Sequence, residues 1–171
     1  MNAQSKPARR LMVLALSAAL AQAVAVSAAS AASLTASGSA ALALAGVVAP
    51  HSPQLGSHDK HVVARLFGGD ADVPYPANKK ITVKADAVMC RTSNVDITAR
   101  SCILTFGSRK RTLKGREANE IYATEAVAGV PSDGAAGSIY ESLSNLVCTL
   151  DPGEIRQKAG GGADCMFDAG P

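Results

Sequence analysis

Five basic side chains gather within eight residues and make the one marked local charge asymmetry of residues 58–171. They are Arg109, Lys110, Arg111, Lys114 and Arg116, and they directly precede a segment that we expect to be helical. Cations beside a helix N-terminus oppose the helix dipole, and an anion bound there reverses that cost. The alternative is a solvated turn whose charge is compensated by Glu117 and Glu120. The sequence therefore supports either an anion- or partner-binding surface or an exposed turn.

The three histidines, His51, His58 and His61, lie within eleven residues of one another. With Asp59 between them, His58 and His61 offer two imidazoles and a carboxylate, and imidazole is a good ligand for zinc, copper or nickel. The segment lies at the edge of the expected domain, where no scaffold fixes a ligand geometry. A weak metal site at His58 and His61 is thus one hypothesis, and exposed linker histidines are the other.

Glu125 is the carboxylate that falls within the apolar arc of an expected helix, beside Ala118, Ile121 and Tyr122. Burial there would raise its pKa, as a general acid requires. The alternative places Glu125 at the helix edge or in a pair with a cation. Residues 62–171 contain no histidine, which argues against Ser-His or Cys-His nucleophilic catalysis in the domain. A carboxylate-dependent, hydrolase-like enzyme using Glu125 is the enzymatic hypothesis that we retain.

Two helices and several strands are expected to position these residues. One helix is predicted from about Arg116 to Ala128, because Gly129 and Pro131 follow as stop signals. The second is predicted from about Ala135 to Leu146 by the helical spacing of its apolar residues. Strand patterns are found before and after these helices, at His61–Phe67, Ile81–Cys90, Val95–Phe106, Cys148–Leu150 and Cys165–Phe167. We therefore expect an α+β fold, a small antiparallel sheet with two helices on one face, in β-β-β-α-α-β-β order.

Four cysteines, all in the carboxy-terminal half, allow three disulfide pairings. We favour Cys90–Cys102 and Cys148–Cys165, because each pair flanks a short connection. A hairpin centred near Asp96 would place Cys90 opposite Cys102 on the same face of the sheet. A metal site with four cysteine ligands is disfavoured, since the chain contains no C-x-x-C pair.

The amino terminus has the pattern of an export signal that is removed. Lys6, Arg9 and Arg10 precede an apolar run, and Ala29-Ser30-Ala31 is a candidate cleavage site. The run from Leu11 to Val26 is short for a membrane span, so a membrane anchor is the disfavoured alternative. We assign residues 1–31 to a cleaved signal peptide, 32–57 to a flexible linker rich in Ala, Ser and Gly, and 58–171 to a disulfide-stapled globular domain.

The charge balance and the expected compartment exclude several classes of function. Lys6, Arg9 and Arg10 account for the whole formal charge of +3, so the remainder of the chain is formally neutral. Nucleic acid is a poor partner, because no aromatic residues interleave with the basic cluster. We expect a periplasmic or secreted binding or interaction module without a cofactor, presenting a surface to a protein or an anionic envelope component. Cleavage would leave no stable membrane anchor.

Overall fold

The computed structural model describes residues 32–70, 72–92, 100–133, 139–158 and 161–169. Its strands all pair antiparallel, and they are β1 (Ala32–Ser37), β2 (Ile81–Thr92), β3 (Ser101–Phe106), β4 (Arg109–Lys114), β5 (Ser132–Asp133), β6 (Ile139–Leu150) and β7 (Ala163–Ala169). Its helices are α1 (Ser39–Val48), the short 3-10 helix η1 (Ala49–His51), α2 (Ser57–Phe67), α3 (Arg116–Ala128) and α4 (Pro152–Gln157). The α+β class is confirmed, but the predicted order of strands and helices is not the observed one.

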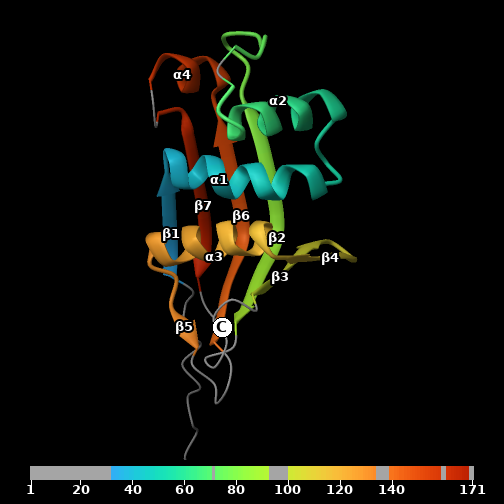
Figure 1. Ribbon diagram of the computed structural model, residues 1–171, viewed down its shortest axis with the longest axis vertical. Helices are drawn as coiled ribbons and strands as arrows, with labels where there is room; N and C mark the ends of the chain where they lie inside the picture. Colours follow the sequence, from blue (N-terminus) through green and yellow to red (C-terminus); the bar gives the residue numbers. More distant parts are fainter. Residues whose placement is uncertain (1–31, 71, 93–99, 134–138, 159–160, 170–171) are drawn as a thin grey trace, which may run out of the picture.

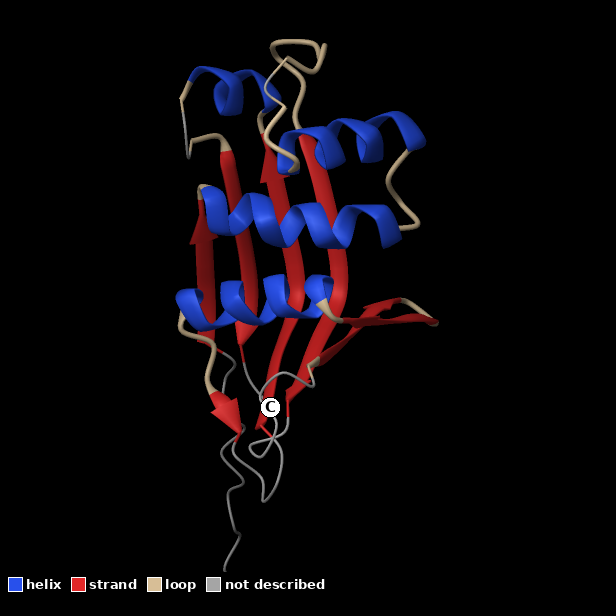
Figure 2. Ribbon diagram, viewed as in Figure 1, coloured by secondary structure: helices blue, strands red, loops and turns tan. Residues whose placement is uncertain are grey.

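One antiparallel sheet organises the molecule, with the strand order β1-β7-β6-β2-β3-β4 and β5 added beside part of β6. Figures 1 and 2 show α1 and α3 running across one face of this sheet, with α2 next to α1 on the same side. The core lies between these helices and the sheet, where side chains such as Leu44, Ile121, Leu104 and Leu146 are fully buried. The opposite face of the sheet carries exposed side chains, including Met89 and Met166.

The predicted linker at residues 32–57 is instead part of the fold. It forms β1, α1 and η1, and β1 pairs along its whole length with β7. Leu44 and Val48 of α1 are fully buried, and so is Ala45. The small side chains that suggested a flexible segment allow α1 to pack closely against α2. Gly46 shows how close this packing is, because a Cβ atom added there would lie 2.4 Å from Cγ of Phe67.

The second predicted helix is also wrong, because the described part of that segment is strand β6. The apolar spacing that suggested a helix has another cause. Leu143 and Leu146 are three residues apart and both face the core, since Asn145 adopts a left-handed backbone conformation with a φ of 54°. This residue shifts the inward face of the strand, and the pairing of β6 with β7 is irregular between Ser144 and Val147.

The same shift of face occurs in β2, next to β6. Ala85 and Val88 are both buried although they too are three residues apart, and Met89 is half exposed. Strict alternation from Ile81 would place Met89 on the inward face, so the alternation is broken beyond Ala85. Because both strands change face at the same level, their register is continuous, with Ala85 opposite Leu146 and Val88 opposite Leu143.

The segment His61–Phe67, predicted as a strand, belongs to helix α2, in which Val62, Val63 and Leu66 are buried at helical spacing. The helix predicted from Arg116 to Ala128 is confirmed as α3. It ends as expected, with Gly129 left-handed at a φ of 76° and its N–H bonded to the carbonyl of Ala126. Propensity and stop signals thus identified one helix correctly and missed another.

Both predicted disulfides are present, Cys90–Cys102 between β2 and β3 and Cys148–Cys165 between β6 and β7. Each joins residues that lie directly opposite each other in the sheet. Two disulfides fit an oxidising compartment. The predicted signal peptide, residues 1–31, lies outside the described residues. Among the described residues, no helix is long and apolar enough to cross a membrane.

Candidate functional site

The basic cluster forms a strand, where the sequence had indicated a turn. Arg109, Lys110, Arg111 and Lys114 belong to β4, the last strand at one edge of the sheet, and Arg116 begins α3. Gly107 and Ser108 connect β3 to β4, and Gly107 has a φ of 59°. Such a two-residue turn with a left-handed glycine first suits the twist of a β-hairpin. The N–H of Gly107 donates to the Asp86 carboxylate on β2, which attaches the tip of the hairpin to the sheet.

The four cations of β4 are distributed over both faces of the hairpin. We call them, together with the backbone of β4, the basic edge. Leu113 is the one buried side chain of this strand. Because side chains alternate along a strand, Arg109 and Arg111 share the face of Leu113, and Lys110 and Lys114 lie on the opposite face. All four are exposed, and the hairpin extends past the adjacent end of α3, to the right in Figure 1.

The outer side of β4 carries no neighbouring strand among the described residues. Phe106 and Arg109 flank the two-residue turn, so they form the first hydrogen-bonded pair of the hairpin. The bonded pairs then recur at Arg111 and Leu113. It follows that Lys110, Thr112 and Lys114 direct their backbone N–H and C=O groups away from β3, toward solvent.

Little negative charge opposes the basic edge. In the described part of the chain, no carboxylate forms an ion pair with the four cations of β4. Arg116, beyond the strand, lies 3.8 Å from Glu120 and is 86% exposed, so that pair is open to solvent. Glu117 is directed toward η1, where its Oε1 lies 3.5 Å from Nε2 of His51. The predicted compensation by Glu117 and Glu120 therefore does not reach β4.

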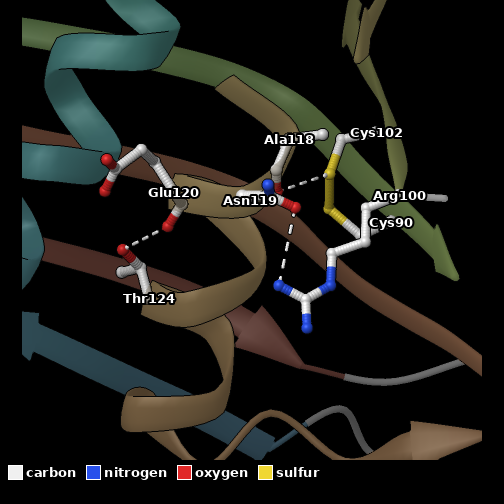
Figure 3. Close-up of a disulfide and its surroundings, with 7 residues drawn as sticks. All are labelled: Cys90, Arg100, Cys102, Ala118, Asn119, Glu120 and Thr124. Atoms are coloured by element: carbon white, nitrogen blue, oxygen red, sulfur yellow. Dashed lines mark hydrogen bonds between the residues drawn. A yellow bond between two sulfur atoms is a disulfide. The ribbon is translucent and has the colours of Figure 1, made fainter. Parts of the chain in front are cut away.

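The disulfide Cys90–Cys102 fixes β3, and through it β4, beneath the first turns of α3 (Figure 3). Cys102 is fully buried, and its Sγ lies 3.6 Å from the carbonyl oxygen of Ala118. On the next residue of α3, the Asn119 side chain accepts a long hydrogen bond of 3.5 Å from Arg100. The Arg100 guanidinium also lies over the ring of Tyr122, 4.2 Å from its centre. These contacts hold the base of the hairpin in place.

Glu125, the candidate acid, is fully buried in α3 between the helix and the sheet. Of the positions that the sequence left open, the helix edge is excluded by this burial. The Glu125 side chain has no solvent-exposed surface. Its backbone carbonyl accepts a hydrogen bond from Val130 N–H at the end of the helix. The geometry therefore gives Glu125 a place in the core of the fold.

The candidate metal ligands lie on α2, not on a mobile segment. His58 is exposed and stacks on Tyr75 with ring centres 5.9 Å apart, and its Nδ1 lies 3.4 Å from Asp59. His61 is exposed one turn further along the helix. Among the described residues, no group of three or more His, Cys, Asp or Glu side chains is arranged to hold a metal ion. Within the described ranges, His58 and His61 are therefore not joined by a third side chain in a ligand arrangement.

A polar cluster that the sequence did not reveal surrounds Tyr75. Its hydroxyl donates to Asp59, 3.1 Å away, and Nζ of Lys79 lies 3.7 Å from the same carboxylate oxygen. Burial raises the pKa of the Tyr75 hydroxyl, and the hydrogen bond with Tyr75 raises the pKa of Lys79. Arg156 of α4 donates to the carbonyls of Val73 and Tyr75. The cluster connects α2 and α4 to the segment that precedes β2, and so it holds these elements in position. No short-range sequence signal marks it.

Comparison with known proteins supplies no relative: no family model, no curated protein and no solved structure matches this chain.

Proposed function

We propose that this protein is an exported binding module that holds an acidic segment of a partner protein against the basic edge. The observation that carries the proposal is the coincidence of four exposed cations with an open strand edge in β4. Complementary charge steers a partner to such a surface and selects against partners of like charge. The hairpin extends beyond the adjacent end of α3 (Figure 2), and the exposed cations lie on both of its faces.

An oxidising compartment after export is part of the proposal. Two disulfides that link neighbouring strands of the sheet support an oxidising compartment. Cleavage after Ala31 would leave β1 intact, because this strand starts at Ala32. A cut further along, up to Ala49, would remove β1 or α1, whose side chains belong to the core. We expect the mature protein isolated from its compartment to begin at Ala32, and intact-mass measurement checks this.

The binding proposal is tested with a defined probe, a fluorescent synthetic peptide of alternating Glu and Thr residues. Fluorescence anisotropy at low ionic strength measures its affinity for the oxidised, mature protein. The double variant Arg109→Glu/Arg111→Glu should bind it at least about tenfold more weakly, because attraction becomes repulsion at two positions. The matched control Lys80→Glu/Lys158→Glu changes the total charge equally, at exposed positions directly before β2 and directly after α4. It should bind within about twofold of the unchanged protein.

Three results would contradict the proposal. The first is that the peptide does not bind the unchanged protein. The second is that both charge variants lose affinity equally, which would show a response to net charge alone. The third is that vesicles of anionic phospholipid bind the protein through Arg109 and Arg111 while the peptide does not. That last result would identify a lipid surface as the binding partner, in place of an acidic protein segment.

A further inference from the structure

We infer that the partner segment binds as an additional β-strand along β4, extending the sheet by one strand. The inference rests on the proposed function and specifies how the acidic segment is held. An edge strand displays unpaired backbone groups, and an extended peptide can satisfy them as the next strand of a sheet does. β4 is six residues long, the usual length of a strand in a globular protein.

The backbone groups that such a strand would pair with are identified by the hairpin register. Arg111 lies opposite Leu104 and Leu113 opposite Cys102, and these positions bond to β3. Lys110, Thr112 and Lys114 have their N–H and C=O groups on the open side. These three residues therefore offer six backbone groups to a strand laid beside β4.

The side chains around this backbone select the chemistry of the partner. Arg109 and Arg111 lie on one face of the hairpin and Lys110 and Lys114 on the other, so an added strand meets cations on both of its faces. Acidic side chains at successive positions of an extended segment would lie opposite them, at cross-strand distances where unlike charges attract. A second copy of β4 would bring like charges together, which disfavours pairing of this edge with itself.

The substitution Thr112→Pro separates this mode of binding from attraction by charge alone. It removes one outward N–H and leaves all four cations in place, and proline is tolerated where a strand's N–H faces solvent. We expect the Glu-Thr peptide to bind Thr112→Pro about tenfold more weakly, since a backbone hydrogen bond is lost and the ring obstructs the added strand. The control Thr112→Val keeps the N–H and should bind like the unchanged protein.

A measurement on the unchanged protein removes the dependence on the folding of a variant. Hydrogen exchange at the backbone amides of Lys110, Thr112 and Lys114, followed by NMR, should slow at least about tenfold when the peptide saturates the protein. The amides of Arg111 and Leu113, which already face β3, should change little.

The outcomes distinguish the two proposals from each other. Peptide binding that is lost in Arg109→Glu/Arg111→Glu but unchanged in Thr112→Pro, without slowed exchange, would overturn the added strand and keep the proposed function. Absence of peptide binding in every form would overturn both. The inference would also be overturned if exchange at these amides slowed as the protein concentration rises, without any peptide. It would identify a second copy of this chain, pairing through its β1 edge, as the occupant.

Discussion

The two edges of the sheet are alike in length and opposite in character. β1 and β4 each have six residues and each pair with a single strand among the described residues. β1, with the sequence ASLTAS, carries no charge, whereas β4, with the sequence RKRTLK, carries four cations. β1 contributes Ala36 to the core and leads into α1, while β4 buries Leu113 alone and belongs to a hairpin that extends past the adjacent end of α3.

This difference bears on why β4 is charged. Lysines on an edge strand commonly prevent it from pairing with other chains, and that role alone would explain some cations on β4. β1 is an edge of the same sheet without such protection. The charges of β4 thus exceed what an edge of this protein requires, which favours a role in binding.

The largest effect that we expect is a loss of stability from a substitution in α1, the helix that follows β1 and covers the sheet. Leu44 is fully buried in α1, so Leu44→Ala leaves a cavity and should lower the free energy of unfolding by about 3–4 kcal/mol. Chemical denaturation measures it, with Leu42→Ala, at a partly buried position, as the milder control. A change no larger than that of the control would mean that residues 39–48 do not form part of the core.

The sequence allowed the strong local signals to be interpreted correctly. The helix that ends at Gly129 and both disulfide pairings follow from stop signals and from the spacing of the cysteines. The end of β6, at Cys148–Leu150, was predicted as a strand, but its first part was predicted as a helix because a single left-handed residue, Asn145, gives the strand the apolar spacing of a helix. No propensity argument reveals such a shift in advance.

Other features depended on tertiary contacts. Helix α1 was missed because alanines contribute little apolar area each, and only close packing against the sheet and α2 makes them a core. At the candidate site, the sequence identified all five cations of the cluster but placed them in a turn. Four of them lie on a sheet edge, and that position depends on pairing with β3, in which Leu113 lies opposite Cys102. The Tyr75 cluster joins residues far apart in the chain, so only the fold reveals it.

The second effect in size concerns the disulfide next to β4. The double variant Cys90→Ala/Cys102→Ala should lose about 3 kcal/mol of stability, because the link constrains the unfolded chain. It should also speed amide exchange in β3 and β4 relative to the rest of the sheet. The control Cys148→Ala/Cys165→Ala opens a link of similar span, 17 residues against 12, and should not affect β4 selectively. Equal exchange in β4 in both variants would contradict a local role for Cys90–Cys102.

A smaller effect is expected at the contact between α1 and α2. A Cβ atom on Gly46 would overlap Cβ and Cγ of Phe67, atoms near the backbone that cannot move aside freely. Gly46→Ala should therefore cost about 2 kcal/mol in thermal or chemical unfolding. Gly56→Ala is the control, since nothing lies within 4 Å of the Cβ it would add. If the two substitutions had equal effects, close packing would not be what makes the alanine-rich segment part of the core.

The smallest effect is the one that decides between the two explanations for the charge of β4. In a variant with Arg109→Ser, Lys110→Thr, Arg111→Ser and Lys114→Thr, this edge becomes as neutral as β1. The four side chains are exposed, so the free energy of unfolding should change by no more than about 0.5 kcal/mol. Since β1 exists as an uncharged edge, analytical ultracentrifugation should find the same association state as for the unchanged protein, while binding of the acidic peptide disappears. New self-association in the neutral variant would instead show that the cations protect the edge, and the contrast between β1 and β4 would then no longer support binding.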